Sequence, residues 1–231
     1  MINAVFFDLY QTLVRYEPPR EEIQAQALND FGINLTPPAL RWPLVVADEF
    51  IYQELARRPW RQRAEADQKV LWVEYERLLL REAGVEADEG LILGLLGKMR
   101  QVQMKLVLFD DVAPTLTELK KRGLILGLIS NIDREINSLL TELGLPTWLE
   151  VVVTSLDAGV TKPQPGIFLE AVRRAGVPAG EAMYVGDQYQ VDVVGAKNAG
   201  MQGVLLDRGG YFDKVTDCPR IRSLRQVVEY L

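Results

Sequence analysis

Side chains that could act on a phosphate or a metal ion follow short apolar runs at widely separated places in this chain. Asp8 ends the first such run, residues 4–7. The others occur in this order: Ser130 with Asn131, Lys162 before Pro163, and Asp187 followed by Asp192. A buried strand that stops at an acid delivers a carboxylate to a loop, where it can be a nucleophile or bind a metal.

Taken together, these residues meet the requirements of phosphoryl transfer. Asp8 can attack in line and form an aspartyl-phosphate. Ser130, Asn131 and Lys162 can supply hydrogen-bond donors and positive charge to the phosphate oxygens. We expect Mg²⁺ to be held by the carboxylates of Asp8, Asp187 and Asp192 and by the backbone carbonyl of Tyr10, because Mg²⁺ prefers oxygen ligands. Tyr10 and Thr12 share the loop of Asp8, and with Lys162 they complete the predicted catalytic group.

Each of these motifs also has an ordinary structural explanation when it stands alone. A Ser-Asn pair after a strand often caps a helix, Lys-Pro is common in surface turns, and Gly-Asp is a frequent turn after a strand. The functional interpretation rests on their order along the chain and on their shared position at strand ends.

The elements that must position these residues alternate along most of the chain. Residues 1–14 give a strand and a loop, and residues 15–104 show only helical spacing, at 21–31, 40–55, 64–83 and 90–106, with no convincing strand. From 105 to 231 we expect strands at 124–129, 150–154, 182–185 and 203–206 between helices at 112–122, 132–143, 165–175, 191–199 and 223–231. This pattern predicts a doubly wound, Rossmann-like α/β core of residues 1–14 and 105–231, with an inserted all-helical cap domain at 15–104. The carboxyl ends of parallel strands carry the sites of such folds.

The composition excludes several kinds of catalytic chemistry and some classes of binding partner. The 231 residues carry a formal charge of −6, with 48% hydrophobic residues and no histidine. The absence of histidine excludes His-dependent triads and imidazole-ligated zinc, and the acidic balance argues against nucleic acid. Cys218 is the only cysteine, so no internal disulfide can form. With no membrane span or export signal in the sequence, we expect a cytoplasmic protein with a small-molecule substrate; a homodimer is left open.

At four places the chain resembles the haloacid dehalogenase superfamily. The matching segments are residues 7–13, 128–131, 162–168 and 186–196. The resemblance covers the whole predicted core, and the helical insert stands where that superfamily commonly places a cap. It implies a hydrolase with Asp8 as its nucleophile. It specifies the reaction less well than it specifies the superfamily.

Tyr10 is the main departure from the phosphatases of that superfamily, which usually carry there a second Asp as general acid and base. Gln11 likewise stands where a glycine is usual. The dehalogenases carry tyrosine at position 10, and arginines of the insert could then bind halide or carboxylate: Arg41, Arg57, Arg58, Arg61 or Arg63. They look metal-free, however, and have a tyrosine where this chain has Phe168, whereas an acid at Asp187 beside Asp8 calls for a cation.

We therefore favour Mg²⁺-dependent hydrolysis of a small phosphorylated metabolite over hydrolysis of a 2-haloacid. Without the usual acid, activated phosphates such as acyl and aryl phosphates should be the better substrates, because a good leaving group does not need a proton. A third interpretation is a catalytically weak module that binds phosphate or a partner.

Overall fold

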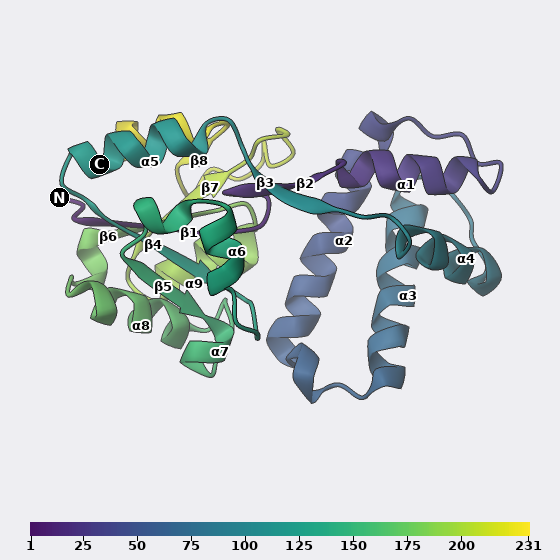
Figure 1. Ribbon diagram of the computed structural model, residues 1–231, viewed down its shortest axis with the longest axis horizontal. Helices are drawn as coiled ribbons and strands as arrows, with labels where there is room; N and C mark the ends of the chain where they lie inside the picture. The colour runs from purple at the N-terminus through teal and green to yellow at the C-terminus, as the bar shows by residue number, and fades with distance from the viewer. The chain divides into compact units, whose positions relative to one another are not determined.

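The computed structural model describes residues 1–231, which form two compact units (Figure 1). One unit combines Met1–Arg15 with Val107–Leu231, and the other is Tyr16–Leu106. Every residue of the predicted catalytic group belongs to the first unit, which we call the core unit. The second is called the helical unit.

A six-stranded parallel sheet in the order β5-β4-β1-β6-β7-β8 forms the centre of the core unit. Its strands are β1 (Ala4–Phe7), β4 (Ile125–Ser130), β5 (Val151–Thr154), β6 (Ala182–Gly186), β7 (Gln202–Leu206) and β8 (Arg220–Ile221). All four residues of β1 are fully buried, as expected of a central strand covered on both faces. The chain winds outward from β1 to β4 and β5, then returns to β6 on the other side of β1. The predicted doubly wound α/β fold is confirmed.

Helices cover both faces of this sheet. They are α5 (Val112–Lys121), α6 (Asn137–Glu142), α7 (Ser155–Ala158), α8 (Pro165–Ala175) and α9 (Gly195–Asn198), with 3-10 or π-helical segments η2 (Leu145–Thr147), η3 (Ala179–Glu181), η4 (Tyr189–Val194) and η5 (Leu224–Tyr230). Figure 1 shows α5 with the C-terminal η5 on one face and α8 on the other. Between the sheet and α8, Phe6, Ile129, Phe168 and Tyr184 share one buried cluster.

Three short strands were not predicted from the sequence. β2 (Val14–Glu17) and β3 (Lys105–Leu108) form a two-stranded sheet, and the boundaries of the two units fall within these strands. β8 has only two residues. Segments of two to four residues carry too little periodicity to be distinguished from a loop.

Some helices differ from their predicted extents. The helix predicted at 132–143 begins at Asn137, because residues 131–136 form a loop at the end of β4. The helix predicted at 191–199 starts as the π-helical turn η4, and the C-terminal one is a 3-10 helix. π-Helical turns are often found at functional sites.

The helical unit packs around a core of its own. Its helices are α1 (Arg20–Asn29), α2 (Pro37–Arg57), α3 (Glu65–Glu82) and α4 (Glu89–Met99), with the 3-10 turn η1 (Trp60–Gln62). Arg20, Asp48 and Tyr75 join α1, α2 and α3 through hydrogen bonds inside this unit. No helix of the chain combines the length and apolar character needed to cross a membrane.

Candidate active site

The site lies where the three central strands end. Asp8 follows β1, Ser130 ends β4, and Asp187 follows β6. β1 is paired with β4 on one side and β6 on the other, with Phe7 opposite both Leu128 and Val185. The Asp8 amide also donates to the Val185 carbonyl at 3.0 Å. The sheet register therefore brings these chemically active loops to one edge, at the point where the winding reverses direction.

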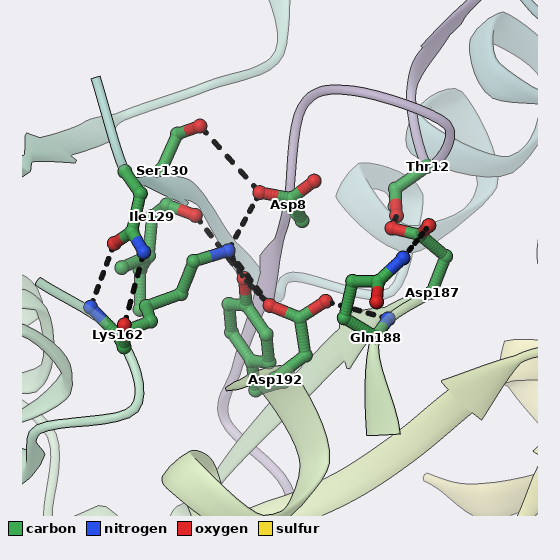
Figure 2. Close-up of polar contacts among 10 residues, drawn as sticks. Asp8, Thr12, Ile129, Ser130, Lys162, Asp187, Gln188 and Asp192 are labelled. Atoms are coloured by element: carbon green, nitrogen blue, oxygen red, sulfur yellow. Dashed lines mark hydrogen bonds and ion pairs between the residues drawn. The ribbon is translucent and has the colours of Figure 1, made fainter. Parts of the chain in front are cut away.

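Lys162 is at the centre of the buried polar network (Figure 2). Its Nζ donates to Asp8 Oδ1 at 2.6 Å, to Asp192 Oδ1 at 2.7 Å and to the Tyr184 hydroxyl at 2.8 Å. These three bonds use all three ammonium protons. Burial disfavours the charged form, but Asp192 and Asp8 outweigh it, so the pKa of Lys162 lies above its ordinary value. Lys162 is therefore a fixed positive charge beside Asp8.

Asp8 keeps one oxygen clear of that network. Its Oδ1 accepts from Lys162 and, at 3.5 Å, from the Ser130 hydroxyl, while Oδ2 accepts from neither (Figure 2). Burial raises the pKa of Asp8 to about 6; Lys162 opposes this and the charge of Asp192 adds to it. A nearby cation would lower that pKa again. Oδ2 is the oxygen that can attack.

Asn131 fixes the loop that carries the lysine. Its Nδ2 donates to the Lys162 carbonyl at 3.0 Å, and its Oδ1 accepts from the Lys162 amide at 2.6 Å. Two opposed bonds to one residue hold that backbone in place, and one amide proton of Asn131 is left for a ligand.

Tyr184 is a site residue that the sequence reasoning did not identify. It is fully buried on β6, and its hydroxyl lies 3.1 Å from both the Ile129 carbonyl and Asp192 Oδ1 in addition to Lys162. The ring of Phe168 packs edge-on against it, with centroids 5.1 Å apart. A tyrosine inside an otherwise apolar strand was the available signal, because a buried hydroxyl needs a partner.

Asp8, Asp187 and Asp192 form an acidic cluster. Each offers a carboxylate oxygen within 4.8 Å of the others. Asp192 is 1% exposed; its Oδ1 accepts from Lys162, and its Oδ2 accepts from the Gln188 amide at 3.0 Å. Asp187 is half-buried and accepts from Thr12 Oγ1 at 3.4 Å and from Gln188 Nε2 at 3.0 Å. One ammonium does not neutralise three carboxylates, so the cluster suits a divalent cation bound by oxygen ligands.

Gly186 allows these acids to lie so close together. A Cβ atom at this position would lie 2.3 Å from Asp192 Oδ2 and 2.4 Å from its carboxyl carbon. Any side chain at position 186 would therefore push Asp192 away from Lys162.

Tyr10 is half-buried in the turn between Asp8 and β2, and Thr12 in the same turn is fully buried. The arginines considered as halide or carboxylate ligands all belong to the helical unit. Four of the five pair with acidic side chains of that unit: Arg41 with Glu21, Arg57 with Glu54, Arg58 with Asp67 and Arg63 with Glu54. Arg61 lies in the turn η1.

The match to a family model decides the family. The model of the haloacid dehalogenase-like hydrolases matches residues 2–200. This chain belongs to the haloacid dehalogenase-like hydrolases. The hydrolase is also 33% identical, over 218 residues, to a glyceraldehyde 3-phosphate phosphatase of Methanopyrus kandleri, covering 92% of this chain and 87% of the relative.

Two solved structures share the fold but carry different names. One is a HAD phosphatase from Thermococcus onnurineus, with a TM-score of 0.58 and 26% identity. The other is a 2-haloacid dehalogenase from Pseudomonas syringae, with a TM-score of 0.56 and 29% identity. Each comparison covers 99% of this hydrolase and 97% of the solved chain. The choice between the two reactions depends on the residues of the site.

Proposed function

We propose that this hydrolase cleaves a small phosphorylated metabolite with Asp8 as the nucleophile and with Mg²⁺ bound at the acidic cluster. The observation that carries the proposal is the proximity of Asp187 to Asp8 and Asp192. Three carboxylates lie close together and two of them share one lysine, which favours a bound cation, whereas carbon–halogen hydrolysis by a carboxylate has no need of one. The phosphatase named above, similar over most of its length, supports the same choice.

The reaction would proceed in two displacements. Asp8 Oδ2 attacks phosphorus, the bond from phosphorus to the leaving oxygen breaks, and an aspartyl-phosphate remains. Water then attacks the same phosphorus, the bond to Asp8 breaks, and inorganic phosphate leaves with the Asp8 carboxylate restored. Lys162 compensates negative charge throughout, and Ser130 with the remaining amide proton of Asn131 supplies donors to the phosphate oxygens.

Asp8, Asp187 and the Tyr10 backbone carbonyl would hold Mg²⁺ directly. When bound, the ion supplies charge neutralisation and orientation for the phosphate. Asp192 adds its charge to this site, but it is almost fully buried and its Oδ1 is paired with Lys162 Nζ, whereas Asp187 is only half-buried. We propose that Asp192 acts chiefly by orienting Lys162, and that Thr12 acts by orienting Asp187.

Tyr10 would determine which phosphates are good substrates. A phenol is a much weaker acid than a carboxylic acid, so it is a poor substitute for the group that protonates a leaving alcohol. The leaving groups of acyl and aryl phosphates depart without that proton, so we propose these phosphates as the preferred class of substrate. The helical unit would serve as the cap that selects the rest of the substrate. We place the enzyme in the cytoplasm, as a monomer or homodimer.

Dehalogenation of a 2-haloacid is the second candidate, and Tyr10 is the observation that favours it. A carboxylate that attacks carbon and expels halide needs no general acid for the leaving group. The pairing of four helical-unit arginines with acids of that unit adds no support to it.

Phosphate release from p-nitrophenyl phosphate tests the proposal, using wild type and Asp8→Asn with Mg²⁺ or with EDTA. The proposal requires turnover that disappears in EDTA and in the Asp8→Asn variant. Turnover that persists in either condition would exclude the proposed mechanism. Halide release from 2-chloropropionate without any phosphatase activity would establish the dehalogenase. Binding of Mg²⁺ and phosphate with no turnover of either substrate would establish a binding module.

A further inference from the structure

The turn that carries Tyr10 and Thr12 is held from behind by an arginine far away in the sequence. Arg208 follows β7, and its Nη2 donates to the Thr12 backbone carbonyl at 3.0 Å. The same guanidinium binds Asp111 through two bonds, from Nη1 to Oδ2 at 2.8 Å and from Nη2 to Oδ1 at 2.9 Å. It also lies 4.0 Å from the centre of the Phe109 ring.

Asp111 is itself anchored from a second direction. Its Oδ2 accepts from the Ser223 hydroxyl at 2.7 Å and from the Leu224 amide at 2.9 Å, at the start of η5. Burial disfavours its charge, but the bonds from Arg208 and Ser223 outweigh burial and lower the pKa of Asp111. The carboxylate is therefore a fixed charged partner that sets the direction of Arg208.

The side chain of Thr12 faces the acidic cluster while its carbonyl accepts from Arg208. Thr12 Oγ1 donates to Asp187 Oδ1 at 3.4 Å, and the residue is fully buried. An unbroken chain of polar contacts thus runs from η5 through Asp111, Arg208 and Thr12 to Asp187. The geometry points to Arg208 as a positioning residue that holds the turn of residues 9–13 so that Thr12 meets Asp187.

Arginine is suited to this role for a geometric reason. Its planar fork binds a carboxylate through two parallel bonds and still presents a further N–H to a carbonyl. A lysine at this position would keep the charge but could not hold both partners in one fixed plane. Arg208→Lys therefore separates the geometric contribution from the electrostatic one.

Amide hydrogen exchange of residues 9–14 tests the proposal without relying on catalysis. We expect Arg208→Lys to speed exchange in this turn roughly tenfold, the effect of losing about one hydrogen bond. Arg220→Lys is the matched control, because Arg220 binds Asp207 and Asp213 in the same C-terminal segment and makes no contact with the turn. Unchanged exchange in the turn, or an equal increase in Arg220→Lys, would overturn the proposal.

A kinetic measurement extends the test and rests on the proposed function. The Mg²⁺ concentration for half-maximal turnover should rise several-fold in Arg208→Lys, while kcat at saturating Mg²⁺ stays within about threefold of wild type. If the wild-type enzyme shows no phosphatase activity, the proposed function is wrong. The hydrogen-exchange experiment still tests the role of Arg208 in that case, because it does not depend on catalysis. If Arg208→Lys does not fold, Asp111→Asn replaces it: it removes the charge that directs Arg208, and faster exchange confined to the turn is required again.

Discussion

At the scale of single residues, one buried lysine organises the hydrogen bonds of the site. Lys162 Nζ donates to two carboxylates and one phenol, and no ammonium proton remains for a substrate. Its contribution to catalysis is therefore charge at a fixed place. Substrate specificity has to come from residues whose donors are still available.

Tyr10→Asp is the residue change that tests the origin of substrate preference. It restores a carboxylic acid to the turn of Asp8, and we expect turnover of alkyl phosphate esters to rise by about 10²-fold or more, the usual range for general acid catalysis. The kcat/KM for aryl phosphates, whose leaving group departs without a proton, should change much less, because kcat/KM reports formation of the aspartyl-phosphate and not its hydrolysis. Steady-state rates for both substrate types provide the comparison, with Tyr10→Asn as the matched control that cannot donate a proton from an acid. An equal gain in Tyr10→Asn would contradict this account.

Sequence reasoning identified the charged groups of the site but not their hydrogen-bond roles. Asp8 and Asp187 are recognisable because each follows an apolar run, Lys162 because it precedes a proline, and Asp192 because it lies five residues after Asp187. Tyr184 was missed because it lies within an apolar run, where an aromatic ring is ordinarily explained by packing. The two hydrogen bonds between Asn131 and the Lys162 backbone could not be predicted, since they depend on how two loops distant in sequence meet.

At the scale of elements, the turn between β1 and β2 contains a strained residue. Gln11 has a φ of 61°, in the left-handed region that favours glycine, and its amide donates to the Val14 carbonyl at 2.8 Å. The position where the superfamily usually has glycine is thus one where this chain adopts a glycine-like conformation.

Gln11→Gly and Gln11→Ala together measure that strain. We expect the glycine variant to be more stable than the alanine variant by roughly 0.5–1 kcal/mol, because left-handed backbone costs alanine more than the added flexibility costs glycine. Urea denaturation of the two variants measures the difference in the free energy of unfolding. A more stable alanine variant would show that the turn is not strained at this residue.

A hydrogen bond between α1 and α3 reaches a carboxyl group buried inside the helical unit. Glu76 is fully buried and accepts from Gln24 Nε2 at 2.5 Å, while its Oε2 has no hydrogen-bond partner. Arg20, Asp48 and Tyr75 form the neighbouring polar network. Burial raises the pKa of Glu76 to about 7; Gln24 and Arg20 oppose the shift.

This raised pKa predicts a pH dependence of stability. The folded state holds the Glu76 proton more tightly than the unfolded chain, so its contribution is complete below the unfolded pKa and is lost as pH rises through about 7. The loss should amount to roughly 3 kcal/mol.

Thermal unfolding between about pH 5 and pH 8 measures this loss. Glu76→Gln should make the profile shallower, because Glu76 no longer titrates; the slope that remains includes Asp8, whose pKa is also raised. Glu74→Gln, on the exposed side of the same helix, should leave the profile of wild type unchanged. A Glu76→Gln profile as steep as that of wild type would show that other groups carry the dependence.

At the scale of the whole molecule, the strands of the sheet could be predicted from the sequence more accurately than the contacts between distant segments. The apolar runs at 4–7, 124–129 and 182–185 correspond closely to β1, β4 and β6, because central parallel strands must be apolar on both faces. The contacts between Arg208, Asp111 and Thr12 join three distant segments and leave no local pattern. The fold and the charged residues of the site were therefore predictable, and the contacts that orient those residues were not.

The proposed mechanism requires that Asp8 becomes phosphorylated during turnover. Acid quenching of the enzyme with an aryl phosphate and Mg²⁺, followed by mass spectrometry of the peptide containing Asp8, measures this directly. We expect a hydroxylamine-sensitive phosphoryl adduct on Asp8. The adduct should accumulate because Tyr10 is a poor general base for its hydrolysis, and it should diminish in Tyr10→Asp. Turnover with no adduct on Asp8, or with an adduct on another residue, would contradict the account.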